Sequence, residues 1–474
     1  MHTEDRAIAP LEELRAAVLA AATAVRGSEG ELAAAPRLER PKHEGQGDYS
    51  TNAAMLLAPV LGSSPRQIAE LLGAKLAERL GSSLERTEIA GPGFLNLFLS
   101  DEWHRRALSG VLAAGDRFGR GGAAPAERIL VEFVSANPTG PLVAASGRHA
   151  AYGDALARIR ATLERYGVEF DSFFSEATLH EGSPNQLERA LAELDQAGHL
   201  YRSDGALWLR TSTFGDDKDR VLERQNGEPT YFAADVAYMQ NKRERGFERQ
   251  LNPMGADHHG YVARLKAAFA ALGGDPELLE VPILQFVHLV EGQERAAMSK
   301  RRGDFVTLDE LLDEIGVDAA RFFMLQRSHD RTLDLDLNLA RSQSRENPVY
   351  YVQYAHARIA SMLARAGDPR VQAAVDGNAD WGDGELHSAE RGLVKKLAAF
   401  PEEVVEAADR RAPHRIAVYS LELAQDFTAF YTDCHVVGAE PKAVESFRMA
   451  LSVAARTVIA RSLQLLGVSA PDSM

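Results

Sequence analysis

The residues with the clearest chemical potential form a turn between a predicted strand and a predicted helix. Residues 129–134 are a short β-branched and aromatic run, which predicts a buried strand. Two prolines and a glycine break this run at 137–141, and a helix is predicted to begin at Ser146. Free backbone N–H groups and the helix dipole favour an anion there, and nucleotides bind off the carboxyl ends of strands in open α/β sheets. The stretch therefore predicts a nucleotide-phosphate site, although glycine-bearing strand–turn–helix units also occur without one.

Two phrases in and after this turn, SANPTGPL and GRHAAYGDALARI, resemble the first signature of the arginyl-tRNA synthetases, a family of class I synthetases. The family normally carries two histidines, spaced His-x-x-His, between the two phrases. This chain has Val143, Ala144, Ala145 and Ser146 at those four places. The first signature is therefore present in outline and lacks both of its histidines.

A second stretch, AMSKRRG at 297–303, resembles the Lys-Met-Ser-Lys signature of the same family, with Ala297 in place of the first lysine. Residues 303–330 continue the resemblance, which fixes the position of the motif. No lysine between 131 and 146 replaces the missing one. The resemblance implies catalytic roles for Met298, Ser299 and Lys300, with Lys300 as a phosphate clamp.

The resemblance also implies a site for arginine and a site for ATP. A guanidinium group favours planar, paired acceptors, which carboxylates and a tyrosine hydroxyl can provide. Glu176, Tyr231 and Asp235 match the family positions for that task, and Glu132 and Asn137 match those that take the substrate's ammonium group. Taken singly, each of these residues also fits an ordinary role as a cap, a core residue or a solvated charge. The residues implied for ATP are Pro138, Thr139, Gly140, Ser146, Gly147, Asp257, His258 and Lys300.

The phrase GADHHG at 255–260 has an alternative interpretation as a metal site, because it places two histidines beside Asp257. A zinc site needs three or four well-spaced ligands, and no further ligand is evident at a suitable spacing. The prediction is therefore no metal site and no tightly bound cofactor, with Mg²⁺ entering only as part of the ATP substrate complex.

The catalytic region is predicted to be shortened as well. The helix that ends near Tyr166 and Gly167 runs almost directly into Val168, where family members carry a further motif and an inserted connective segment. Removing one preorganised charge-stabilising donor typically costs ~2.7–4 kcal/mol in the reaction barrier. The loss of two histidines and one lysine would then raise the reaction barrier by about 8–12 kcal/mol, or by less if the three residues act as a unit.

Three hypotheses follow. The first is an arginyl-tRNA synthetase that activates arginine with ATP and transfers it to tRNA(Arg), with impaired activity. The second is a catalytically silent paralogue that binds tRNA or arginine without aminoacylation. The third, supported only by the shortening, is a ligase that uses adenylate chemistry on another acceptor.

The composition limits the kind of protein that carries these motifs. The chain has 474 residues, 45% hydrophobic and 26% charged, with a formal net charge of −15, so an RNA partner needs a local basic face. The single cysteine, Cys434, excludes an intramolecular disulfide and is typical of a reducing cytoplasm. No signal peptide and no run of membrane-spanning length are expected. A cytoplasmic monomer is the form that the family resemblance implies.

The elements that must position these residues divide into three predicted domains. The predicted fold class is α/β, a Rossmann-type class I synthetase catalytic domain at 127–345, between an N-terminal α+β domain at 1–120 and a C-terminal all-α helical bundle from 346 to 474. In the first domain, helices are predicted at 11–22, 53–61 and 65–80, a capping turn at 45–52, and two strands within 88–99. In the last domain, long helices are predicted at 350–366, 386–408, 416–434 and 442–466.

Both outer domains resemble tRNA-contacting domains of the family. Phe94 and Asn96 are candidates for stacking on and hydrogen-bonding an unpaired base, or are instead a core phenylalanine and a turn asparagine. Candidates for phosphate contacts in the bundle, each of which also fits a solvated surface charge, are Arg410, Arg411 and Arg415 together with Lys395, Lys396 and His414.

Overall fold

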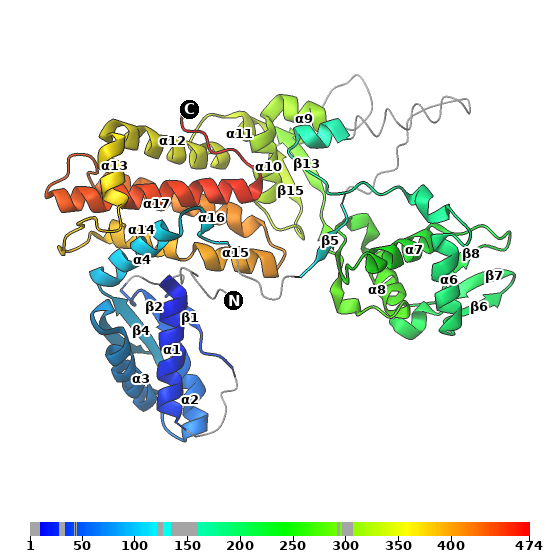
Figure 1. Ribbon diagram of the computed structural model, residues 1–474, viewed down its shortest axis with the longest axis horizontal. Helices are drawn as coiled ribbons and strands as arrows, with labels where there is room; N and C mark the ends of the chain where they lie inside the picture. The colour runs from blue at the N-terminus through cyan, green and yellow to red at the C-terminus, as the bar shows by residue number, and fades with distance from the viewer. Residues whose placement is uncertain are drawn as a thin grey trace. The chain divides into compact units, whose positions relative to one another are not determined.

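The computed structural model describes residues 10–27, 34–41, 43, 45–120, 127–133, 160–291, 294–295 and 307–474. The chain forms two compact units, one made of residues 1–121 with 342–474 and the other of 122–341 (Figure 1). The first signature turn and the second signature stretch lie outside the described residues.

The first unit begins with a four-stranded antiparallel sheet in the order β1-β2-β4-β3. Helix α3 packs on β3, and α2 packs on β4. The helices predicted at 53–61 and 65–80 are confirmed, as is the strand pair around the Gly-Pro turn. The segment predicted as a capping turn is wrong in part, because 49–51 form a strand. The elements are α1 (Pro10–Arg26), β1 (Leu38–Glu39), β2 (Tyr49–Thr51), α2 (Ala53–Leu61), α3 (Pro65–Leu80), η1 (Gly81–Ser83), β3 (Leu84–Ala90) and β4 (Phe94–Leu99).

Local sequence explains where α3 begins. The side chain of Ser64 accepts a hydrogen bond from the backbone N–H of Gln67, whose side chain in turn accepts from the backbone of Ser64. Pro65 occupies the first helical position, where its missing N–H costs nothing. Ile68 and Leu72 on this helix are buried, whereas Leu71 is 57% exposed.

The rest of the first unit is a helical bundle in which α16 and α17 pack together and both contact α12 and α14. One helix was predicted over 386–408, and this is wrong, because the chain forms two helices that meet at Ala399. Pro401 accounts for the break, since it has no N–H to donate back along a continuous helix. The elements are α4 (Asp101–Ala114), η2 (Gly115–Arg117), α12 (Pro348–Ala366), α13 (Asp368–Val375), α14 (Ser388–Ala398), α15 (Phe400–Asp409), α16 (His414–Asp433) and α17 (Lys442–Leu466).

Helix α17 is the central helix of this bundle. It has 25 residues, and among the described helices it is the one that is long and apolar enough to cross a membrane. No run of that length was predicted from the sequence. Most of its apolar window, 61%, is buried inside the protein. Phe447, Leu451, Val458 and Ile459 are among its buried side chains. The hydropathy of α17 is therefore the property of a core helix.

The second unit is built on short parallel strands. The central three run in the order β11-β9-β5, with Ile129 opposite Arg249 and Val131 opposite Leu251. Two further parallel pairs are β10 with β12 and β13 with β15. These parallel pairings agree with the predicted α/β fold class. The elements here are β5 (Ile129–Val131), β9 (Arg249–Leu251), β10 (Met254–Gly255), β11 (Leu279–Glu280), β12 (Ile283–Leu284), β13 (Val287–Glu291), β14 (Glu294–Arg295) and β15 (Leu333–Asp336).

Helices α6, α7 and α8 enclose the core of the second unit, whose buried side chains include Leu194, Val236, Met239, Leu265 and Phe269. A separate antiparallel sheet, β6-β7-β8, follows α6. The elements are η3 (Glu176–His180), α6 (Gln186–Gln196), β6 (Leu200–Ser203), β7 (Ala206–Leu209), η4 (Thr211–Phe214), β8 (Arg220–Glu223), α7 (Tyr231–Glu244), η5 (Ala256–Tyr261), α8 (Val262–Ala271), η6 (Pro276–Leu278), α9 (Leu308–Ile315), α10 (Val317–Leu325) and α11 (Leu337–Arg341).

Candidate active site

Glu132 follows directly after the last residue of β5, at the carboxyl end of a parallel strand. Its backbone N–H donates to the carbonyl of Leu251 at 2.9 Å, which continues the pairing with β9. Its side chain is 27% exposed and accepts a hydrogen bond from Nζ of Lys242 at 2.5 Å. The carboxylate predicted to take the substrate's ammonium group is thus held by both its backbone and an ion pair.

Helix α7 supplies four polar side chains that are spaced along one face. Tyr231, Asp235, Tyr238 and Lys242 are separated by steps of four, three and four residues, which places them one above another. The helix begins at Tyr231 because Oγ1 of Thr230 accepts from the backbone N–H of Ala233 at 3.3 Å. Tyr231 is 81% exposed, whereas Lys242 is 1% exposed. The face therefore runs from the surface into the interior.

Asp235 is half-buried and accepts a hydrogen bond from the hydroxyl of Tyr261 at 2.6 Å. Burial raises the pKa of Asp235, and the Tyr261 hydrogen bond opposes that rise. The carboxylates of Glu132 and Glu176 raise this pKa further, because they are negative charges close to Asp235. The charges of Glu132 and of the solvent-exposed Glu176, the other two carboxylates predicted to bind arginine, therefore act on Asp235.

Lys242 is the basic counterpart of these carboxylates. Burial lowers the pKa of Lys242, and the ion pair with Glu132 opposes that change. Nζ also lies 3.5 Å from Oδ1 of Asn252 and 4.4 Å from the ring centre of Tyr238. The Tyr238 ring stacks on Phe174 at 4.0 Å, and burial raises the pKa of Tyr238 to about 12. Aromatic and amide contacts thus surround the lysine.

This arrangement suits a ligand with two positive charges. Three carboxylates and one ammonium carry a net charge of −2 when all are ionised. A guanidinium group forms paired hydrogen bonds with planar carboxylates, and a partly desolvated site strengthens these hydrogen bonds. The site is therefore suited to a small cation that carries both a guanidinium and an ammonium group.

Asp257 and His258 lie in η5, directly after β10. Nε2 of His258 is 3.5 Å from Oδ2 of Asp257, and their side chains are 60% and 66% exposed. This exposure leaves both side chains accessible to a ligand. Within the described residues, no group of three or more His, Cys, Asp or Glu side chains has a metal-binding arrangement.

Several predicted site residues lie outside the described residues. They belong to the first signature turn and the second signature stretch, and they include every residue predicted to be catalytic. They are Asn137, Pro138, Thr139, Gly140, Ser146 and Gly147, together with Met298, Ser299 and Lys300.

The two N-terminal candidates for base contact differ in accessibility. Phe94 is 37% exposed at the start of β4, so its ring is available for stacking. Asn96 is 6% exposed in the middle of β4, between Ser50 and Glu88 in the sheet. Asn96 is therefore a strand residue, neither the turn residue considered as its alternative nor an open hydrogen-bonding group.

Most of the phosphate-contact candidates in the bundle have acidic partners. Arg410 pairs with Glu406 at 2.7 Å, and Arg415 pairs with Glu403 at 2.8 Å. Arg411 donates to the carbonyl of Ala408 at 2.7 Å. Lys395 pairs with Asp48 at 2.6 Å, and Lys396 is 8% exposed and pairs with Glu422. Burial makes Lys396 unsuited to a phosphate contact.

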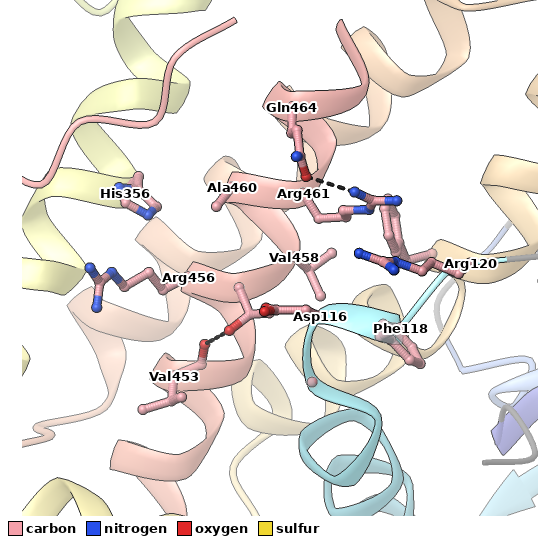
Figure 2. Close-up of a pocket in the computed structure, with 13 residues that line it drawn as sticks. Asp116, Phe118, Arg120, His356, Val453, Arg456, Val458, Ala460, Arg461 and Gln464 are labelled. Carbon is pink, nitrogen blue, oxygen red and sulfur yellow. Dashed lines mark hydrogen bonds between the residues drawn. The ribbon is translucent and has the colours of Figure 1, made fainter. Parts of the chain in front are cut away.

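The first unit also contains a cavity that the sequence did not predict. It has a volume of about 450 Å³ and is lined by Arg120, Arg456 and Arg461 (Figure 2). Arg456 pairs with Asp472 at 2.6 Å. Arg461 donates to Gln464 at 2.6 Å, and its buried Nε has no hydrogen-bond partner. Within the described residues, Arg120 and Arg461 form no ion pair, and the carboxylate of Asp116 also lines the cavity, so positive charge is in excess there.

Sequence reasoning missed Lys242, Tyr261 and Asn252 in the carboxylate cluster. Lys242 is seven residues after Asp235, and helical spacing identifies it as a neighbour once α7 is known. Tyr261 and Asn252 lie on other elements, so the sequence contains no spacing signal that connects them to Asp235 or Lys242.

Three protein-family models match successive parts of this chain. The arginyl-tRNA synthetase N-terminal domain matches residues 12–99, and the catalytic domain of the arginine-type class I tRNA synthetases matches 158–359. The DALR anticodon-binding domain matches 352–474. These matches confirm the predicted fold class, with its α+β, class I catalytic and all-helical parts.

Two solved structures share the fold over nearly the whole chain. The arginyl-tRNA synthetase of Thermus thermophilus has a TM-score of 0.70 at 22% identity, over 98% of this chain and 99% of that one. The enzyme of Plasmodium falciparum has a TM-score of 0.72 at 12% identity, with the same coverage. At such low identities these likenesses concern the fold alone.

Sequence relatives give the family. The arginine–tRNA ligase of Carboxydothermus hydrogenoformans is 39% identical over 92% of this chain and 94% of its own length. That of Bacillus subtilis is 37% identical over 98% of both chains. The first alignment spans 529 positions, more than the 474 residues of this chain, so the relative has residues without a counterpart here. With this identity over nearly its whole length, the chain belongs to the arginyl-tRNA synthetase family.

Proposed function

We propose that the protein is an arginine–tRNA ligase, which activates arginine with ATP and transfers the arginyl group to tRNA(Arg). The observation that carries this proposal is the cluster of Glu132, Asp235 and Glu176, whose net charge with Lys242 matches the two cationic groups of arginine. The relatives named above bear the name arginine–tRNA ligase and align over nearly their whole length, which supports the same activity.

In the proposed reaction, the guanidinium group lies against Asp235, Glu176 and Tyr231, and the ammonium group lies at Glu132. The substrate carboxylate attacks the α-phosphorus of ATP, the bond to the bridging oxygen breaks, and pyrophosphate leaves. A hydroxyl at the 3′ end of the tRNA then attacks the arginyl carbonyl, and AMP leaves. The contribution of the protein is to hold the carboxylate in line with the α-phosphorus and to stabilise charge.

ATP is proposed to bind as its Mg²⁺ complex, with its phosphates between 137–147 and 298–302. Lys300 is the expected cation at the leaving pyrophosphate. The side chains at 143–146 cannot replace two histidines as charged donors, so we expect the rate of activation to be below that of a chain with intact signatures.

The direct test is arginine-dependent exchange of labelled pyrophosphate into ATP, together with charging of tRNA(Arg). We expect exchange above a blank without arginine, and formation of arginyl-tRNA. Exchange with another amino acid and not with arginine would refute the proposal, whereas adenylate transfer to another acceptor would replace it with the third hypothesis. Binding of tRNA or arginine with neither reaction, by protein shown to be folded, would instead identify a silent paralogue.

The tRNA is proposed to contact the first unit through its basic groups. The cavity is lined by Arg120, Arg456 and Arg461 with the carboxylate of Asp116, so it has an excess of positive charge, which favours a phosphodiester. Such contacts release counterions, so the affinity for tRNA is expected to fall steeply with salt.

Sedimentation of the free protein tests the monomeric state that the family resemblance implies.

A further inference from the structure

Lys242 stands out because it is an almost fully buried cation in the interior of the second unit. It is 1% exposed and is the one charged residue among the largest fully buried side chains of the described residues. Burying an ammonium group is costly unless it is paired and hydrogen-bonded. A core position on α7 would be filled more favourably by an apolar side chain, such as that of the neighbouring buried Met239. Packing alone therefore does not explain a lysine at this position.

The strongest contact of Lys242 is to Glu132. Nζ donates to Oε2 of Glu132 at 2.5 Å, whereas the contact to Asn252 is longer, at 3.5 Å. Within the described residues, this is the one side-chain hydrogen bond that Glu132 accepts. The lysine thus occupies one carboxylate oxygen and leaves Oε1 for another donor.

Lys242 also changes the charge of the cluster. Glu132 and Glu176 are negative charges that raise the pKa of Asp235, and Glu132 contacts the same lysine directly. Without a cation, the half-buried carboxylates of Glu132 and Asp235 repel each other, and at least one is expected to take up a proton. Lys242 counters this repulsion, because it attracts both Glu132 and Asp235.

We propose that Lys242 is a positioning residue for arginine activation. It keeps Glu132 ionised and directs Oε1 of that carboxylate to the α-ammonium group of arginine. This inference rests on the proposed function, since it assigns Lys242 to the same arginine site. Lys242 acts through Glu132 and makes no contact with the substrate itself.

The test compares Lys242→Met, which removes the charge at similar length, with Lys242→Arg, which keeps it. In pyrophosphate exchange we expect Lys242→Met to raise the KM for arginine about ten- to a hundredfold and to leave the KM for ATP within about twofold. Lys242→Arg should recover part of the loss. The matched control is Lys266→Met on α8, a partly exposed lysine whose nearest acid is Glu277 at 3.7 Å, and it should change neither constant.

A guanidinium-only probe separates positioning from general damage to the site. Butylguanidine has no ammonium group, so its inhibition constant should be the same for the wild type and for Lys242→Met. An equal loss of affinity for arginine and butylguanidine would overturn the proposal. An unchanged or lower KM for arginine would do so as well, because the lysine would then be neutral or a competitor of the substrate.

Folding is controlled by a second variant. Lys242→Met leaves Glu132 half-buried without its partner, whereas the double variant Glu132→Gln/Lys242→Met removes both charges and should regain thermal stability. The double variant should bind arginine no better than Glu132→Gln alone, and additive losses would contradict action through Glu132. Calorimetric titration with arginine separates the two proposals. A wild type that neither exchanges nor binds arginine refutes both, whereas equal binding by the wild type and Lys242→Met refutes this one alone.

Discussion

The carboxylate cluster of the second unit and the arginine-lined cavity of the first unit use charge in opposite ways. In the cluster, Lys242 is buried, Glu132 and Asp235 are half-buried, and short contacts fix them, such as Lys242 to Glu132 at 2.5 Å and Tyr261 to Asp235 at 2.6 Å. In the cavity, Arg120 and Arg461 have the same sign and form no ion pair within the described residues. Fixed, desolvated groups select a small ligand, whereas unpaired surface cations attract a polyanion and remain sensitive to salt.

Replacing the central carboxylate is the strongest way to test this contrast. Asp235→Asn keeps the shape of the side chain and removes the charge that faces a guanidinium group. We expect kcat/KM for arginine to fall roughly a hundred- to a thousandfold, because a partly buried charge pair loses one partner. Pyrophosphate exchange measures the loss, and tRNA affinity serves as the control that should not change. Retention of arginine affinity would show that the cluster is structural.

A smaller effect is expected from Tyr261→Phe, which removes the hydroxyl that donates to Asp235. The KM for arginine should rise roughly tenfold, as for a lost hydrogen bond to a charged group. The pH dependence gives a sharper result. Burial raises the pKa of Asp235 above its ordinary value, so arginine affinity should fall as pH falls, beginning above the range of an exposed aspartate.

The variant should move that loss to still higher pH, because the Tyr261 hydrogen bond lowers the pKa of Asp235. The measurement is log kcat/KM against pH for both proteins. A profile that is flat down to pH 4 in the wild type, or the same in both proteins, would contradict the coupling between Tyr261 and Asp235.

The smallest effect is expected at the cavity. Arg120→Gln/Arg461→Gln should weaken tRNA binding only about three- to tenfold at 0.15 M salt and reduce the salt slope by about one for each lost phosphate contact. Arg365→Gln, an exposed arginine on α12, is the matched control. Arginine-dependent exchange without tRNA should be unaffected. An unchanged slope would remove the cavity from the tRNA-binding surface.

Local signals predicted much of the fold. The limits of α3 follow from the capping residues Ser64 and Gln67 with Pro65 at one end and Gly81 at the other. Those of α17 follow from Pro441 and Gly467, and both predicted ranges agree with the structure. The strand at 49–51 was missed because its polar residues are typical of a turn and its pairing with β4 is remote in sequence. The break at Ala399 was missed because apolar periodicity continues across Pro401.

The candidate site was predictable only where the family resemblance reached. Glu132, Asp235 and Glu176 were named from matching phrases, and the charges of the two glutamates act on Asp235. The burial of Lys242 was not predictable, because a lysine near the end of a helix is usually solvated. The contact between Tyr261 and Asp235 joins residues on two elements, so no local pattern reveals it.

Helix α7 has one more consequence. Seven residues separate Asp235 from Lys242, so the two anchors of the proposed arginine site are roughly 10 Å apart along a rigid axis. Asp235 faces the guanidinium end of arginine. Lys242 holds Glu132, the carboxylate proposed to bind the ammonium group at the other end. Both are attached to the same rod, so the distance between them stays constant when loops move. The fixed spacing therefore selects ligands by length, and we expect a guanidinium amino acid with one methylene fewer to be too short to bind at both ends.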